Sequence, residues 1–253
     1  MELQEWIHRK REQLSRLGPA DLRNVAPSIK DFHQAVTTQR GPLAVVCEIA
    51  RATPEEGSLT DRFDLEDLVR AMDSASVSAI AVATDPIACA GSDGDLADVA
   101  RVAPMPIIAR DLFVDRAQIY RARLNGADAV ALIAGALGGS ELRSLIDAAA
   151  STHMAAAMEV ASEEELAAAS SAGARIVVIP AFANGKLSLA IAEALLPKIS
   201  RRITALVRGP FQSAAELDLV RSRADGIWIA GPLMRAVDPA AFLGPLVEAA
   251  ENG

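Results

Sequence analysis

A regular alternation of short apolar runs and amphipathic helical segments constrains the fold of this chain more than any other feature. Apolar runs typical of buried strands lie near residues 43–48, 78–83, 105–110, 128–133, 155–160, 175–179, 203–208 and 226–230. Helical patterns lie between them, near 62–75, 94–102, 116–125, 140–151, 162–172, 188–197, 212–222 and 238–251. Strands that alternate with helices pair in parallel, so the sequence predicts a parallel sheet.

The connections that lead from a helix to the next strand carry a similar five-residue motif four times, which indicates repeated βα units. It reads SVSAI, GADAV, GARIV and RADGI, at residues 76–80, 126–130, 173–177 and 223–227. Eight such units fit a closed (β/α)8 barrel better than an open doubly wound sheet. The first strand is not followed by a Gly-x-Gly-x-x-Gly motif, which further weakens a dinucleotide-binding fold.

The length of 253 residues is typical of one such barrel. We expect a single domain over residues 1–253, with the barrel in 43–253 and a helical extension and connector in 1–42. Within that extension, residues 1–17 place apolar side chains at helical spacing, and Gly18-Pro19 is expected to end the helix.

Composition excludes several classes of protein. The 25 Lys and Arg residues against 33 Asp and Glu give a net charge of −8, and the absence of a basic block argues against nucleic-acid binding. No apolar run approaches the roughly 20 residues that span a bilayer, so we expect a soluble, cytoplasmic protein, monomeric or homodimeric. The separated residues Cys47 and Cys89 suggest neither a disulfide framework nor a metal site.

Charged residues stand where three predicted strands end. Glu48, Arg110 and Glu159 each follow directly on an apolar run. A buried charge is costly unless it has a partner or a task. Because side chains alternate along a strand, these three should point toward the barrel mouth at the carboxyl ends of the strands, and the residues before them should face the helix layer: Cys47, Ala109 and Met158.

Several motifs resemble those of the indole-3-glycerol-phosphate synthase family, and the resemblance covers nearly the whole chain. Residues 48–57, EIARATPEEG, resemble the family's Glu-x-Lys-x-x-Ser-Pro-Ser-x-Gly opening motif. Residues 106–120, PIIARDLFVDRAQIY, are similar to its third strand and the following helix, and residues 158–166, MEVASEEEL, to its fifth strand. Thr84-Asp85 after the second strand also agrees.

The resemblance implies a (β/α)8 barrel that closes, decarboxylates and dehydrates an anthranilate-linked deoxyribulose phosphate without a cofactor. Glu159 then corresponds to the acid–base glutamate, and Glu48 to a supporting one. Arg110 takes the place of the catalytic lysine. A guanidinium polarises a carbonyl but does not readily give up a proton.

Other positions also depart from the family pattern. Ala50 stands in place of the lysine on the first strand, and Ala181 lies near a missing asparagine. The phosphate-binding serines give way to Gly209-Pro210 and Gly231-Pro232, while Arg208, in place of a glutamate, can meet an anion through a bidentate contact. The substrate-binding candidates are therefore Arg51, Thr53, Ala181, Arg208, Gly209 and Gly231.

Three functional hypotheses remain open. The leading one is a diverged lyase or cyclase of this type, with Glu48, Arg110 and Glu159 acting on a small molecule that carries a phosphate or lacks one. The second is a catalytically silent barrel that binds a ligand or a partner protein, in which the three charges only pair with one another. The third is the family's standard reaction. We further expect Glu55 and Glu56 to face solvent by default, and Trp228 to pack between barrel and helices. If the two glutamates instead line the mouth, they would repel an anionic substrate.

Overall fold

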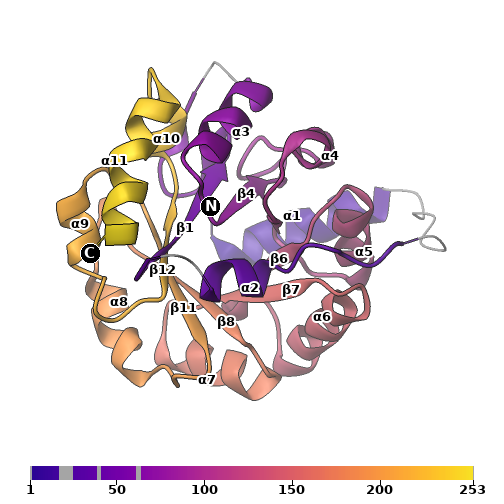
Figure 1. Ribbon diagram of the computed structural model, residues 1–253. Helices are drawn as coiled ribbons and strands as arrows, with labels where there is room; N and C mark the ends of the chain where they lie inside the picture. Colours follow the sequence, from indigo (N-terminus) through magenta and orange to yellow (C-terminus); the bar gives the residue numbers. More distant parts are fainter. Residues whose placement is uncertain (1, 17–24, 39–40, 61–63, 253) are drawn as a thin grey trace.

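The computed structural model describes residues 2–16, 25–38, 41–60 and 64–252, and it contains a closed parallel barrel surrounded by helices (Figure 1). The strands are hydrogen-bonded in the order β1-β12-β11-β8-β7-β6-β5-β4. Every predicted strand is present, with bounds shifted by at most two residues: Ala44–Ile49 (β1), Ala79–Ala83 (β4), Ile107–Arg110 (β5), Ala129–Ile133 (β6), Ala155–Glu159 (β7), Ile176–Pro180 (β8), Thr204–Gly209 (β11) and Gly226–Ile229 (β12). The prediction of a (β/α)8 barrel is confirmed.

Alternation along the strands divides the core into two layers. The side chains inside the barrel include Val46, Ile108, Val178 and Leu206, together with many alanines. The residues between them, such as Val45, pack against the helices. Because many interior side chains are small, the interior also accommodates side chains from a helix that precedes the first strand, described below.

The helices follow the strands in the predicted order. They span Leu65–Ser74 (α3), Asp93–Val102 (α4), Arg116–Leu124 (α5), Gly139–Ser151 (α6), Glu163–Ala172 (α7), Ala190–Leu195 (α8), Ala214–Asp218 (α9) and Pro239–Asn252 (α11), with 3-10 turns at Ala134–Ala136 (η2) and Leu196–Lys198 (η3). The side chains of Asp64, Ser92 and Ser162 cap α3, α4 and α7 by accepting a backbone N–H bond. Helix α9 is shorter than predicted, because the chain continues in turns.

The segment before the first strand forms two helices. Helix α1 (Leu3–Arg16) confirms the predicted amino-terminal helix, and its expected end at Gly18-Pro19 lies outside the described residues. Helix α2 (Phe32–Thr37) was not predicted, and its Phe32 and Val36 complete the interior cluster of the barrel. Within the described ranges, no helix combines the length and the apolar character that crossing a bilayer requires.

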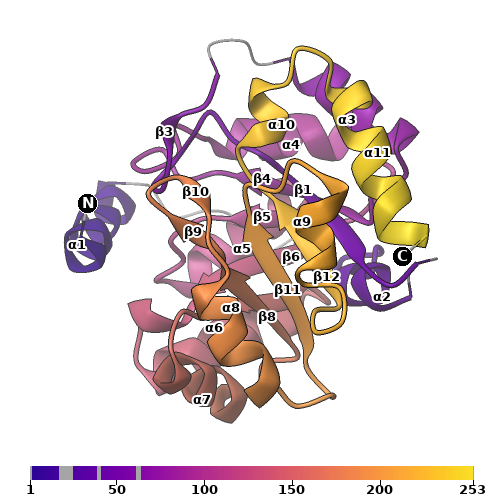
Figure 2. The same ribbon diagram turned by 90° about the vertical axis from the view of Figure 1, so that its left-hand side faces the viewer.

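Two short hairpins and one short helix rise from the carboxyl ends of the strands. The hairpins are Ala52–Thr53 with Gly57–Ser58 (β2–β3) and Phe182–Ala183 with Lys186–Leu187 (β9–β10), and the helix is Pro232–Arg235 (α10). Figure 2 shows β3 and β10 side by side at this end of the barrel. A Cβ atom at Gly185 would lie 3.7 Å from the Glu55 carbonyl oxygen, so the two hairpin tips are in contact.

Candidate active site

Five charged side chains meet at the carboxyl ends of the strands. Four come from strands β1, β5, β7 and β11, and the fifth comes from the tip of hairpin β2–β3. We call this group the charge cluster; its members are Glu48, Glu55, Arg110, Glu159 and Arg208. The structure therefore brings together the three predicted strand-end charges and the predicted substrate-binding candidate Arg208, and adds Glu55.

Glu48 is the centre of the charge cluster and is fully buried. Its Oε2 accepts hydrogen bonds from Arg208 Nε at 2.9 Å and from Trp228 Nε1 at 2.8 Å. Its Oε1 has no hydrogen bond and lies 3.6 Å from Arg110 NH1. Trp228 thus points into the barrel, and the expectation that it packs against the helices is wrong. Trp228 lies two residues before Ala230, which also faces the barrel interior, so alternation along the strand indicates the inward direction.

Arg110 lies between three carboxylates. Its NH2 is 3.8 Å from Glu55 and 3.8 Å from Glu159, and its NH1 donates to Cys89 Sγ at 3.7 Å. Burial and the neighbouring Arg208 lower its pKa, but Glu48 and Glu159 outweigh both and the pKa is raised. Arg110 therefore remains a cation, which can polarise a carbonyl group but makes a poor proton donor.

Arg208 is fully buried, and each edge of its guanidinium faces a carboxylate. Nε bonds to Glu48, while NH1 and NH2 lie 2.8 and 3.4 Å from the two oxygens of Glu55. The Phe182 ring covers one face, with its centroid 5.0 Å from the guanidinium carbon. Burial lowers the pKa of Arg208, but the attraction of Glu48 and Glu55 is stronger and raises it well above its usual value.

Both hairpin glutamates turn inward, so the expectation that they face solvent is wrong. The Glu55 side chain is 21% exposed and that of Glu56 only 4%. Glu56 Oε1 accepts a bond of 2.8 Å from Arg235, and Oε2 is buried without a hydrogen bond. A Cβ atom at Gly231 would lie 2.1 Å from Glu56 Oε2, so the carboxylate is packed directly against that glycine.

The cavity beside Arg110 and Glu159 at the mouth is small in this conformation. A cavity of about 10 Å³ lies beside Arg110 and Glu159, and its other lining residues are Trp6, Asp85, Cys89, Asp111, Ala131 and Ile133. That volume holds about one water molecule. A substrate of the size of a sugar phosphate therefore needs part of the mouth to move.

The remaining substrate-binding candidates have structural partners. Arg51 makes a bidentate ion pair with Asp95 of α4, at 2.5 and 2.9 Å. Thr53 Oγ1 accepts from the Glu56 backbone N–H at 3.2 Å, which helps to close the hairpin. Ala181 and Gly209 pack together, because a Cβ atom at Gly209 would lie 3.3 Å from the Ala181 Cβ.

A second buried charged group, not predicted from the sequence, joins α1 to the mouth. Lys10 Nζ is 3.0 Å from Asp85 and makes an ion pair with Asp111. Trp6 Nε1 also donates to Asp85, at 3.1 Å. Burial raises the pKa of Asp111 to about 7, because Asp85 adds to the effect of burial while Lys10 only partly offsets it.

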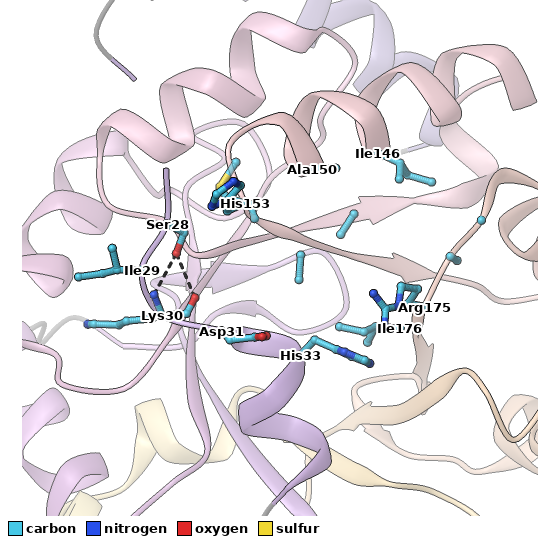
Figure 3. Close-up of a pocket in the computed structure, with 15 residues that line it drawn as sticks. Ser28, Ile29, Lys30, Asp31, His33, Ile146, Ala150, His153, Arg175 and Ile176 are labelled. Carbon is cyan, nitrogen blue, oxygen red and sulfur yellow. Dashed lines mark hydrogen bonds between the residues drawn. The ribbon is translucent and has the colours of Figure 1, made fainter. Parts of the chain in front are cut away.

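Another pocket, of about 430 Å³, lies at the opposite end of the barrel, where β7 and β8 begin (Figure 3). His33 and Arg175 lie close together on its wall, and His33 Nε2 is 3.3 Å from Thr204 Oγ1. Barrel chemistry takes place at the carboxyl ends of strands, so the charge cluster remains the candidate active site. Among the described residues, no three His, Cys, Asp or Glu side chains are grouped to hold a metal ion.

Comparison with known proteins agrees with this architecture. A model of the family described as indole-3-glycerol phosphate synthase matches residues 2–246. The indole-3-glycerol phosphate synthase of Roseiflexus sp. is 35% identical over 225 residues, covering 84% of this chain and 83% of that protein. Indole-3-glycerol phosphate synthase 1 of Streptomyces coelicolor is 29% identical over 248 residues, covering 95% of this chain and 91% of the relative.

Solved structures show the same fold at lower identity. 3-Hexulose-6-phosphate synthase from Salmonella typhimurium superimposes with a TM-score of 0.67 at 16% identity, covering 82% of this chain and 98% of that one. Tryptophan synthase subunit alpha from Legionella pneumophila gives 0.64 at 13%, with coverage of 89% and 100%. These two similarities concern the fold alone. Because the family model spans almost the entire sequence, the chain belongs to the indole-3-glycerol phosphate synthase family.

Proposed function

We propose that this chain is a carbon–carbon lyase that closes and decarboxylates an anthranilate-derived or closely related small molecule. The substrate differs from that of its relatives at its anionic end. The observation that carries the proposal is the pairing of a fixed cation with an accessible carboxylate: Arg110 NH2 lies 3.8 Å from Glu159, whose side chain is 17% exposed at the mouth.

Exposure separates the roles of the two strand-end glutamates. Glu48 is fully buried and holds Arg208 and Trp228, so it acts as a positioning residue. Glu159 reaches the mouth and is the carboxylate that can exchange a proton with a substrate. Arg110 donates N–H groups to a carbonyl oxygen and stabilises the negative charge that develops there. Ring closure and dehydration then depend on Glu159 for proton transfer.

The residues around Gly231 support a substrate whose anionic end differs from the phosphate of the family's substrate. In the motif of the family that this chain resembles, backbone N–H groups and serine hydroxyls hold the phosphate in this region. Here Pro210 and Pro232 lack an N–H group, and the Glu56 carboxylate packs against Gly231. A carboxylate at this point repels a phosphate, which supports a substrate with a smaller or less charged group.

The test compares two substrates that differ only in the phosphate. The purified protein is given the anthranilate-linked deoxyribulose with and without its 5-phosphate, and indole formation is followed by fluorescence. We expect turnover of both, with kcat/KM for the phosphorylated compound no more than about tenfold higher. A much larger preference for the phosphate would instead assign the family's standard reaction.

A matched pair of variants assigns the catalytic carboxylate. Glu159→Gln should lower kcat by about 10²–10⁴-fold, as expected for loss of a general acid–base group. Glu66→Gln removes the same charge from an exposed position of α3 and should leave kcat unchanged. Equal activity of the two variants would remove Glu159 from the mechanism.

One observation favours a second candidate function. The cavity beside Arg110 and Glu159 measures only about 10 Å³, which is compatible with a silent barrel that binds a partner or ligand elsewhere. This candidate predicts that neither compound is turned over by the folded protein. Detection of an indole product from either compound would exclude it.

A further inference from the structure

We propose that Arg208, with Arg110 beside it, is a binding subsite for an anionic group of the substrate, and that the Glu55 side chain competes with the substrate for this subsite. The ligand chemistry is that of a carboxylate or phosphate whose oxygens accept from a guanidinium fork. The inference rests on the proposed function only in taking the barrel mouth as the place where the substrate binds.

The geometry of Arg208 is that of a prepared anion site. Its Nε is held by Glu48 at 2.9 Å, and Glu48 is in turn fixed by Trp228. The Phe182 ring covers one guanidinium face at 5.0 Å. The edge formed by NH1 and NH2 is directed at the two oxygens of Glu55, the arrangement in which arginine binds a carboxylate in bidentate form.

The charge balance explains why a ligand must replace Glu55. The charge cluster contains two arginines and three glutamates, so it carries one net negative charge while Glu55 is in place. Without Glu55, two arginines would face two glutamates, and the buried NH1 and NH2 groups of Arg208 would lose the acceptors that they have at Glu55. Buried donors without an acceptor are unfavourable. An incoming carboxylate or phosphate removes that penalty, so substrate binding drives the exchange.

The connections of hairpin β2–β3 allow its tip, which carries Glu55, to move away from Arg208. Strands β2 and β3 form a two-stranded sheet of their own in the described part of the chain, through Ala52 with Ser58 and Thr53 with Gly57. The base is closed by the bond from the Leu59 N–H to the Arg51 carbonyl at 2.8 Å, and it is held to the loop after β4 by the bond from the Ala52 N–H to the Cys89 carbonyl at 3.1 Å. The tip can therefore swing about a fixed base.

Glu56 ties the same movement to the space over Gly231. Its carboxylate covers that glycine and bonds to Arg235 at 2.8 Å, while Oε2 stays buried without a donor. Because Glu55 and Glu56 are neighbours on one tip, release of either side chain displaces the other. One displacement thus exposes both the Arg208 fork and Gly231.

Protonation is not the trigger for this exchange. Burial raises the pKa of Glu55, but Arg208 and Arg110 outweigh it and lower the pKa to about 2. Glu55 thus remains a carboxylate across the neutral range. The competition is between two anions, and its outcome depends on ligand concentration.

The decisive experiment is calorimetric titration of the full chain with 2-aminobenzoate and, separately, with inorganic phosphate. Wild type, Glu55→Gln and the charge-matched control Glu66→Gln are compared. We expect Glu55→Gln to bind one of the two probes at least about tenfold more tightly than wild type, because the internal competitor is weakened. Glu66→Gln should match wild type. The probe that gains affinity identifies the class of anion.

Hydrogen exchange on the wild-type protein provides the second measurement, which does not depend on how well a variant folds. A saturating probe should increase amide exchange in residues 53–58, because the tip leaves its position. Unchanged affinity of both probes in Glu55→Gln overturns the proposal, as does exchange in 53–58 that stays constant or falls. Tighter binding without turnover of any substrate would overturn the proposed reaction and leave the anion subsite standing.

Discussion

Asp111 shows at the scale of one residue how burial sets chemistry next to the mouth. Its pKa is raised from 3.8 to about 7, whereas that of Glu55 is lowered from 4.5 to about 2. Asp111 is buried beside Asp85, and Lys10 only partly offsets these two effects, so its pKa is raised. Glu55 faces Arg208 and Arg110, which outweigh the effect of burial and lower its pKa. The pKa values of two carboxyl groups at one end of the barrel are therefore shifted in opposite directions.

The raised pKa of Asp111 predicts a pH dependence of stability. The folded protein binds more protons than the unfolded chain between about pH 4 and pH 7, so this group's contribution to the free energy of unfolding falls as pH rises through that window. Asp111→Asn should remove that contribution. We expect the Tm of wild type to drop more than that of Asp111→Asn between pH 5 and pH 8, by about several degrees in calorimetry.

The exposed variant Asp98→Asn is the control, because Asp98 is half exposed and pairs with Arg101 on its own helix. It should follow the wild-type curve. Identical pH profiles for wild type and Asp111→Asn would show that Asp111 is ionised at neutral pH.

Arg110→Lys tests whether one substitution accounts for the departure from the family pattern. A lysine restores a titratable cation but loses the fork that spans three carboxylates. Because Glu55 and Glu56 still fill the mouth, we expect kcat/KM on the phosphorylated family substrate to rise by less than about tenfold. A rise of about a hundredfold or more would mean that the pocket is otherwise intact.

At the scale of secondary-structure elements, helix α1 depends on one buried cation. Lys10 is 2% exposed and pairs with Asp85 and Asp111, which belong to the loops after β4 and β5. Lys10→Met leaves two buried acids without their cation and should lower the free energy of unfolding by about 3–5 kcal/mol in urea denaturation.

Arg11→Met offers the comparison for that experiment. Arg11 is more than half exposed and lies 3.7 Å from Glu141, so its loss should cost no more than about 1 kcal/mol. Equal midpoints for the two variants would mean that the α1 contact contributes little to stability.

The unpredicted elements are short, and their signals are local. Asn184 and Gly185 both adopt positive φ angles, 52° and 72°, which is the turn that an Asn-Gly pair favours in a two-residue hairpin. The Asn-Gly pair was therefore enough to indicate β9–β10. In β2–β3, Pro54 and Gly57 mark a turn, but no periodicity indicates that the tip folds inward. Its direction depends on Arg208, about 150 residues away.

At the scale of the whole molecule, the repeated βα pattern was sufficient to predict the barrel. Local periodicity predicts each barrel strand and the helix that follows it, and eight units leave few ways to close. The strand-end charges Glu48, Arg110 and Glu159 could also be placed, because alternation fixes which way they point. The contacts of Glu55, Glu56, Trp228 and Lys10 could not, since each depends on side chains from distant segments.

The seam of the barrel has a consequence for folding kinetics. Strand β1 pairs with β12, and the bond between Trp228 and Glu48 joins residues 180 positions apart. The conformational entropy lost in closing a loop grows with the length of the loop. Pairing β1 with β12 therefore costs more entropy than pairing strands that are neighbours in the sequence. Glu48 of the charge cluster lies beside this seam. It is held by Trp228 only after β12 has been synthesised and has paired with β1, so the charge cluster takes its final form late in folding.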